Sequence, residues 1–235
     1  MKPTAIPVLY EDNHLLVVVK PEGIPVQADR SGDLDMLTVL KADLKLRHKK
    51  PGNVFLGLVH RLDRPVGGVM VFAKTSKSAS RLSSQIRARQ FGKIYLAAVQ
   101  GVPEQKRGRL VHWLLKDRNS NTVAIVDGST PLAKEAVLDY DVAGQNGRDA
   151  LIRIQLVTGR PHQIRVQMAA IGHPLRGDTK YGAVRQPEGG AIELWADAIS
   201  LAHPTQQAPM QFAAPPEHRP KWLREFDQTS IRFHS

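Results

Sequence analysis

The chain has 235 residues, an apolar content of 42%, no cysteine and a formal net charge of +11. The lack of cysteine excludes disulfides, thiolate metal sites and a cysteine nucleophile. No apolar run approaches the length of a membrane helix, and the N-terminus lacks the pattern of a secretory signal, so we expect a cytoplasmic protein. The positive charge would draw the chain to polyanions, but basic surfaces also aid solubility, so charge alone leaves nucleic-acid binding an even choice.

The first third of the chain predicts strands around one helix. Tyr10 to Val19 predicts a turn and then a buried strand, which Lys20-Pro21-Glu22-Gly23 ends because proline lacks a donor and glycine permits a turn. Apolar residues at helical spacing predict a helix over Leu34 to Leu46, followed by a basic loop. Asp63 lies in a polar loop directly before an apolar strand, Val69 to Ala73, and rigid strands often present site residues in this way.

The middle of the chain is less regular. Ser76 or Ser78 can cap a helix that runs to Phe91 with Ala79, Leu82 and Ile86 inside, and Gly92 is placed to end it. Lys93 to Val99 is expected to be the next strand. Residues 101–147 are polar and rich in turns, and a single strand is expected there, at Ala136 to Val142.

The last third predicts a strand, a helix and a covering tail. Leu151 to Val157 alternates apolar and polar residues, as a strand does. Residues 158–161 are expected to start a helix, with Pro161 in its first turn, Ile164, Met168 and Ile171 buried, and Arg165 at the edge between core and solvent. The tail from His203 onward should be an extended cover. Strands and helices mixed without regular alternation predict an α+β domain.

Asp63 is the first candidate for chemistry. The nearby Arg61 and Arg64 favour an ionised carboxylate, which suits a nucleophile or a base. Structural ion pairs outnumber catalytic ones, so the local sequence alone favours a structural pair.

Tyr95 and Arg165 have the same two readings. A strand tyrosine such as Tyr95 is usually a core residue but could stack on a base. Arg165 could pair with a carboxylate or a phosphate, or could be a solvated helix charge. The nine histidines show no metal-ligand spacing, and Gly67-Gly68 lacks the pattern of a phosphate loop, so we expect neither a metal nor a cofactor.

Five segments, in order, resemble the blocks of the RluA-type family of RNA pseudouridine synthases. They are LLVVVKPEGIPV (15–26), HRLDRPVGGVMV (60–71), RLSSQIRARQFGKIYLAAVQG (81–101), LVTGRPHQIRVQMAAIGHPLRGDTKYG (156–182) and ELWADAISLAHP (193–204). The resemblance implies a mixed, largely antiparallel sheet with flanking helices and a central RNA-binding cleft. Because the Lys-Pro-x-Gly turn begins at Lys20, we expect one catalytic domain over residues 1–235, without a separate N-terminal RNA-binding domain.

The resemblance implies that Asp63, Tyr95 and Arg165 catalyse the isomerisation of uridine in RNA, without cofactor or metal. Asp63 would attack as a nucleophile or start an elimination on the ribose, and both routes stay open. Arg165 would keep Asp63 ionised and oriented, and Tyr95 would pack against the uracil. Six residues would bind the substrate, with Arg61 filling the space left by the flipped uridine and Leu194 closing an apolar slot: His60, Arg61, Arg64, Lys93, His162 and Leu194.

Basic residues at 47–50 and 81–89 would bind phosphates, although a solvated face is nearly as good an interpretation for each. Four departures from the family pattern indicate a divergent subgroup: Val66-Gly67-Gly68 where Thr-Ser-Gly is usual, Gln167 and Trp195 where histidines are usual, and Leu138 where a threonine is usual. Family frequency favours ribosomal over transfer RNA as the substrate, and we expect a monomer.

Two other functions stay open. The first is a catalytically inactive RNA-binding protein on the same fold. The second is an unrelated acid-base hydrolase, which would need a second carboxylate near the first. Asp178 is the candidate in a strong motif, but its place after a Gly-rich turn favours helix capping.

Overall fold

The computed structural model describes residues 6–29, 31–117, 119–184 and 191–226. They form two compact units, the first made of Met1–Gly92 with Ala196–Arg219 and the second of Lys93–Trp195 with Pro220–Ser235. The described elements are eleven strands, three α-helices and three short 3-10 helices. The expected α+β fold with a mixed, largely antiparallel sheet is confirmed.

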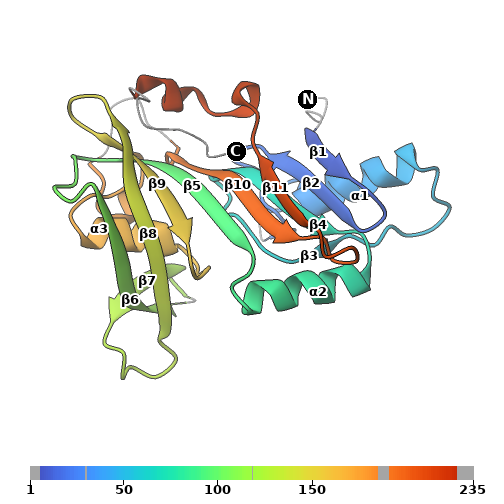
Figure 1. Ribbon diagram of the computed structural model, residues 1–235, viewed down its shortest axis with the longest axis horizontal. Coiled ribbons are helices and arrows are strands. Elements are labelled where there is room, and N and C mark those ends of the chain that lie inside the picture. Colours follow the sequence, from blue (N-terminus) through green and yellow to red (C-terminus); the bar gives the residue numbers. More distant parts are fainter. Residues whose placement is uncertain (1–5, 30, 118, 185–190, 227–235) are drawn as a thin grey trace. The chain divides into compact units, whose positions relative to one another are not determined.

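The first unit is built on two strands whose every residue is buried, β2 (Leu15–Lys20) and β4 (Gly67–Ala73). They pair antiparallel, as Figure 1 shows, and β1 (Val8–Glu11) and β3 (Gly57–Leu58) pair antiparallel with β2 and β4 respectively. Strand β10 (Leu194–Ala202) enters this unit from Ala196 and pairs antiparallel with β11 (Pro209–Ala213). Such uninterrupted burial explains the run of valine and leucine in β2.

Helix α1 (Met36–Arg47) agrees with the predicted helix to within two residues. Asp35 sets its start, because its side chain accepts a hydrogen bond from the Thr38 N–H. Met36, Leu40 and Leu44 are buried, which gives the apolar stripe that the spacing predicted.

Helix α2 (Ser76–Arg87) packs on β3 and β4 but is shorter than predicted. Thr75 caps it by accepting from the Ser78 N–H, and Arg89 ends it by adopting a left-handed backbone at φ 59°, so Gly92 does not end it. Its buried residues are Ser78, Leu82 and Gln85, whereas Ala79 and Ile86 are half-buried. The Gln85 amide explains this rotation, since it bonds the backbone N–H and carbonyl of Ala202.

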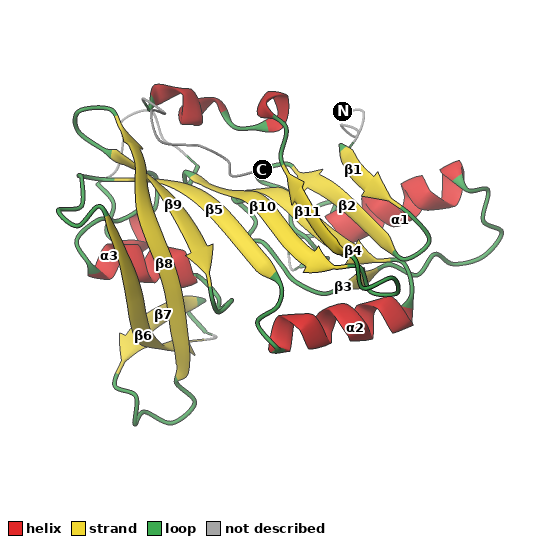
Figure 2. Ribbon diagram, in the orientation of Figure 1, coloured by secondary structure: helices red, strands yellow, loops and turns green. Residues whose placement is uncertain are grey.

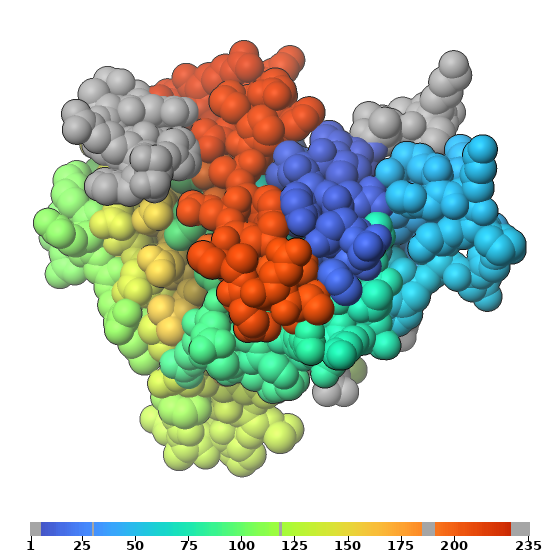
Figure 3. Space-filling model, turned by 45° about the vertical axis from the view of Figure 1, so that its right-hand side comes forward, coloured from blue at the N-terminus to red at the C-terminus, as the bar shows by residue number. Residues whose placement is uncertain are grey.

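The surface of the first unit brings distant segments together. In Figure 3 the orange surface of the β10–β11 region lies beside the blue surface of the N-terminal strands. The rings of Tyr10 and Phe212 lie 5.5 Å apart, which accounts for this contact. The proline-rich tail therefore contributes strand β11 and two 3-10 helices, η2 (Pro216–His218) and η3 (Lys221–Glu225), rather than only the extended cover that we expected. Its residues from 227 onward lie outside the described part.

The second unit contains an antiparallel series of five strands, and Figure 2 colours these, like all strands, yellow. The order is β5, β9, β8, β6, β7, and each neighbouring pair is antiparallel. The strands are β5 (Gly92–Val99), β6 (Arg107–Asp117), β7 (Thr122–Val126), β8 (Lys134–Gln145) and β9 (Ala150–Leu156). Helix α3 (Gln163–Ala170) lies against β6 and β7.

The prediction for residues 101–147 was wrong, because this region is regular and holds three strands. Along β6, exposed residues, among them Arg109 and Trp113, alternate with less exposed ones. One face of β6 thus meets solvent, so the strand carries charges and lacks the apolar run that identifies a buried strand. The expected strand at Ala136 to Val142 is the central part of the longer β8.

Helix α3 differs from its prediction at its start and in its burial. His162 holds a left-handed backbone at φ 51°, so the helix begins at Gln163 and Pro161 precedes it. All residues from Gln163 to Met168 are buried, and Arg165 is only 6% exposed. The predicted edge position of Arg165 was therefore wrong, because Asp178 and Tyr181 from the segment beyond α3 pack against its guanidinium.

Candidate active site

Asp63 lies in a turn between β3 and β4 and is half-buried. Its carbonyl oxygen accepts a hydrogen bond from the Val66 N–H at 3.0 Å, which closes the turn. Gly68 is the second residue of the following strand, β4, with φ 122°, and a Cβ there would lie 2.1 Å from the Ala196 carbonyl oxygen. Glycine is therefore required at this point of the segment Val66-Gly67-Gly68.

Lys20 stabilises this turn from its buried side. Its side chain is fully buried at the end of β2, and its ammonium donates to the carbonyl oxygens of Pro21, Arg64 and Val66 at 3.0, 3.0 and 2.7 Å. The three N–H bonds of the ammonium are thus all used on backbone oxygens. Burial lowers the pKa of Lys20 to about 8, against the opposing effect of the charges on Glu22 and Asp63.

The sequence reasoning missed Lys20 as a site residue. The available signal was a lysine that ends an otherwise apolar strand, since a buried charge requires partners. Two of the three partners come from a turn more than forty positions away, and local pattern does not show them.

Two predicted substrate-binding residues fix the same turn. The exposed Arg64 donates from Nε to the Gly23 carbonyl oxygen at 3.0 Å and from Nη2 to Asp33 at 2.5 Å. His60 accepts the Val71 N–H at Nε2 over 3.0 Å, and its ring lies 5.5 Å from that of Phe91. These contacts tie the turn to its neighbours, whatever further role the two residues have toward RNA.

Arg61 is exposed on this turn, and among the described residues its side chain makes no hydrogen bond or ion pair. An exposed guanidinium without a fixed partner is able to reorient toward a bound polyanion. Arg61 thus differs from its neighbour Arg64, whose guanidinium is already engaged.

The second unit holds Tyr95 and Arg165. Tyr95 lies on β5 opposite Ile154 of β9 and is 8% exposed. Arg165 and Asp178 form a buried ion pair, with Nε 2.6 Å from Oδ2 and Nη2 2.8 Å from Oδ1. Asp178 precedes the 3-10 helix η1 (Thr179–Tyr181) but makes no side-chain cap, so the expected capping role was wrong.

The remaining predicted residues of this unit differ in exposure. Lys93 on β5 is half-buried, and burial lowers its pKa. His162 lies with its Nδ1 2.6 Å from the hydroxyl of Tyr181. Leu194 is 5% exposed at the start of β10.

The atypical residues Gln167 and Trp195 are both buried. Gln167 is fully buried and its amide nitrogen donates to the carbonyl oxygens of Leu110 and Ala136, at 3.2 and 3.1 Å. It therefore fastens α3 to β6 and β8. Trp195 is 3% exposed beside Leu194. Both replacements have become part of the packing around the candidate residues.

The basic segment at 47–50 is partly neutralised. Arg47 pairs with Asp43 and Glu11, and His48 lies 2.7 Å from the Glu11 carboxylate. Burial alone would raise the pKa of Glu11, but hydrogen bonds from Lys74, His48 and Arg47 lower it to about 2. Arg47 is therefore less suited to phosphate than Lys49 and Lys50, which are exposed.

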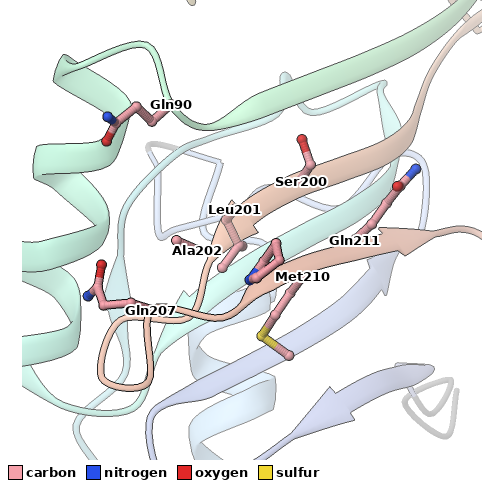
Figure 4. Close-up of a pocket in the computed structure, with 8 residues that line it drawn as sticks. Gln90, Ser200, Leu201, Ala202, Gln207, Met210 and Gln211 are labelled. Atoms are coloured by element: carbon pink, nitrogen blue, oxygen red, sulfur yellow. The ribbon is translucent and has the colours of Figure 1, made fainter.

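An open groove of about 490 Å³ lies on the first unit, between the end of α2 and strands β10 and β11 (Figure 4). Its lining is uncharged and contains none of the predicted site residues: Gln90, Ser200, Leu201, Ala202, Gln207, Pro209, Met210 and Gln211. Without a cation it offers nothing for a phosphate, so we do not assign the site to it.

Two features are absent from the described residues. No group of three or more histidine, aspartate or glutamate side chains gathers there in a way that could hold a metal ion. No helix in that part of the chain is long and apolar enough to cross a membrane.

Comparison with known proteins gives one consistent result. Residues 14–170 match the family model described as RNA pseudouridylate synthase. An uncharacterized RNA pseudouridine synthase of Mycoplasma genitalium is 34% identical over 89% of this chain and 66% of its own length. Ribosomal large subunit pseudouridine synthase C of Buchnera aphidicola is 32% identical over 88% of this chain and 66% of its own length. The chain thus spans slightly less than two thirds of these two relatives.

Solved structures show the same fold. The human RNA pseudouridylate synthase domain containing 4 superimposes with a TM-score of 0.78, at 24% identity, over 93% of this chain and 90% of that one. The matched family segment, residues 14–170, contains Asp63, Tyr95 and Arg165.

Proposed function

Because the chain belongs to the RluA-type family of RNA pseudouridine synthases, we propose that it isomerises uridine to pseudouridine in RNA. One observation carries the proposal: the turn that bears Asp63 is held by the buried ammonium of Lys20 through three backbone oxygens. A carboxylate on a turn fixed in this way is preorganised for chemistry, since the folded chain has already met the cost of ordering it.

In the proposed reaction Asp63 is the catalytic carboxylate. The bond between ribose C1′ and uracil N1 breaks, the uracil rotates, and a bond forms between C1′ and C5. The proton leaves C5 and N1 gains one, so no oxidant, cofactor or metal is required. Asp63 attacks as a nucleophile or starts the reaction as a base on the ribose, while Arg165 keeps it ionised and Tyr95 packs on the uracil.

The target uridine must leave its stack to reach such a site, at a cost of about a few kcal/mol. We propose that Arg61 occupies the vacated space, and its exposure on the Asp63 turn supports this role. Leu194 would close the apolar slot, and His60, Arg64, Lys93 and His162 would complete the substrate contacts. Of these, Arg64 has the weakest support, because its guanidinium already bonds Gly23 and Asp33.

The substrate class is the finer part of the proposal. The name of the Buchnera relative refers to the large ribosomal subunit, which supports ribosomal RNA over transfer RNA for this chain. We propose a cytoplasmic monomer in which residues 1–235 act as one catalytic domain. Asp63 belongs to the first unit, and Tyr95 and Arg165 belong to the second.

The hydrolase alternative depends on Asp178 as its second carboxylate. Asp178 already accepts two hydrogen bonds from Arg165 and is 1% exposed, so it is poorly placed to protonate a leaving group. An inactive RNA-binding protein on this fold is the other alternative, and the activity assay distinguishes it.

The first test compares the wild-type chain with Asp63→Asn on ribosomal RNA transcripts, by counting pseudouridine formed. We expect Asp63→Asn to lose at least about a thousandfold in rate, as variants lacking a catalytic nucleophile do. Asp43→Asn is the control, because that exposed carboxylate lies on α1 and pairs only with Arg47 among the described residues.

Two results would contradict the proposal. A wild-type rate in Asp63→Asn would remove the assigned role of Asp63. RNA binding by the wild-type chain without any pseudouridine, on ribosomal and transfer RNA alike, would favour the inactive RNA-binding protein.

A further inference from the structure

Arg165 forms a buried ion pair with Asp178 in the second unit. The side chains of Arg165 and Asp178 are 7% and 1% exposed. Two parallel hydrogen bonds join the Nε and Nη2 edge of the guanidinium to both carboxylate oxygens. A bidentate pair of this kind fixes the plane and the rotation of the guanidinium as well as its position.

Stability alone does not explain such a pair. Replacing a buried ion pair with apolar residues is often neutral or stabilising, because desolvation of the two charges offsets their attraction. The pair does, however, fix the direction in which the guanidinium points. With the Nε edge bound to Asp178, the planar fork must present its Nη1 edge away from that carboxylate.

Tyr181 supplies a second constraint. The Arg165 guanidinium carbon lies 5.0 Å from the centre of the Tyr181 ring. The hydroxyl of Tyr181 accepts a hydrogen bond from the Val123 N–H at 2.9 Å and lies 2.6 Å from Nδ1 of His162. The ring that packs on Arg165 is therefore itself anchored to β7 and to the residue preceding α3.

Asp178 and Tyr181 are parts of one rigid turn. The Asp178 carbonyl oxygen accepts from the Tyr181 N–H at 3.1 Å, and the Asp178 N–H donates to the Leu175 carbonyl oxygen at 3.0 Å. Both contacts to Arg165 therefore come from a single backbone unit, within the segment Gly177 to Gly182. One turn defines an edge and a face of the guanidinium together.

We propose that Asp178 and Tyr181 are positioning residues that aim the Nη1 edge of Arg165 at the anionic group it serves in the reaction. The inference rests on the proposed function, because it deepens the role of Arg165 in the same site. Asp178 acts through Arg165 and does not touch the substrate. Tyr181 limits the tilt of the guanidinium, and the contact between its hydroxyl and His162 helps to hold the ring in place.

The experiment measures kcat and KM for ribosomal RNA transcripts with Asp178→Asn, Asp178→Glu and Tyr181→Phe. A misplacement of about 1 Å can cost about a hundredfold in rate, so we expect a loss of that order in kcat for Asp178→Asn with KM little changed. Asp178→Glu should recover part of the loss, and Tyr181→Phe should lose about tenfold.

Asp139→Asn is the matched control. Asp139 makes the same bidentate pair with Arg109, at 2.7 and 2.8 Å, but that pair is exposed on the second unit. This control should leave kcat unchanged. If Asp178→Asn lowers thermal stability but keeps the wild-type kcat per folded molecule, the pair is structural only and the inference is wrong.

A second readout does not depend on activity. The Nε–H signal of Arg165 in nitrogen-15 NMR, identified by its loss in Arg165→Lys, should be protected from solvent exchange in the wild-type chain. Its exchange should accelerate at least about tenfold in Asp178→Asn, as expected when a charge-assisted hydrogen bond is lost, and stay unchanged in Asp139→Asn.

Activity and Nε–H exchange test the proposed function and the positioning role of Asp178 separately. A wild-type chain without activity would refute the proposed function, while exchange at Arg165 would still decide whether Asp178 holds it. Unchanged exchange in Asp178→Asn would overturn the inference. If Asp178→Asn fails to fold, Asp178→Glu and Tyr181→Phe provide the same comparison, and wild-type kcat and exchange in both would overturn it.

Discussion

The Asp63 turn and the Arg165 helix each hold a proposed catalytic charge next to a buried charge of opposite sign, but they do so through different atoms. The Lys20 ammonium bonds only backbone oxygens: two in the turn, and that of Pro21, which follows Lys20 in the chain. Asp178 bonds the side chain of Arg165 itself. The turn should therefore keep its shape whatever side chain stands at position 63, whereas the second arrangement exists only with arginine at position 165.

Arg165→Lys should show the largest effect of this difference. Lysine keeps the charge but cannot form the bidentate pair with Asp178, so its ammonium has no fixed direction. We expect kcat for pseudouridine formation to fall by at least about a hundredfold. Activity within threefold of wild type, measured on the same transcripts, would show that charge alone suffices and would break the comparison.

Lys20→Met tests the backbone arrangement. The variant removes the ammonium and leaves the buried Val66 carbonyl oxygen without that donor, while the Arg64 carbonyl oxygen keeps the Gly23 N–H. We expect the free energy of unfolding to fall by about 2 to 4 kcal/mol, measured by urea denaturation at neutral pH. A loss below about 1 kcal/mol would mean that Lys20 does not hold the turn.

The same variant predicts a dependence on pH. Because burial lowers the pKa of Lys20 from 10.5 to about 8, the unfolded chain binds more protons than the folded chain between these values. Stability contributed by Lys20 should therefore rise with pH across this window, by up to about 3 kcal/mol, and be constant below pH 8. The difference between wild type and Lys20→Met, followed from pH 7 to 10.5, isolates this contribution.

Arg64→Ala should have the smallest effect. Arg64 joins the same turn to Gly23 and Asp33, but its side chain is 46% exposed and solvent screens the pair. We expect a change in the free energy of unfolding of less than about 1 kcal/mol, measured beside Lys20→Met. An effect as large as that of Lys20→Met would show that the exposed contacts of Arg64 stabilise the turn as much as the buried contacts of Lys20.

Much of the fold could be predicted because local pattern determines it. The buried strand at Leu15, helix α1 and strand β9 follow from apolar spacing and were found close to their predicted positions. Strand β6 escaped prediction because one of its faces meets solvent and carries charged residues, and β7 escaped because it is only five residues long and partly exposed. Helix α3 began later than expected because His162 adopts a left-handed backbone, which no sequence pattern announces.

The sequence by itself determined the family and the fold, since its five blocks occur in the family's order and the family model matches residues 14–170. It also singled out Asp63, Tyr95 and Arg165, whose catalytic roles stay predictions. Only the tertiary structure decided which buried charges support them. Lys20 meets the carbonyl oxygens of residues 44 and 46 positions away, and Arg165 meets a carboxylate 13 positions away. Such pairs depend on strand register and on the path of the connecting loops, and neither is encoded in the few residues around each charge.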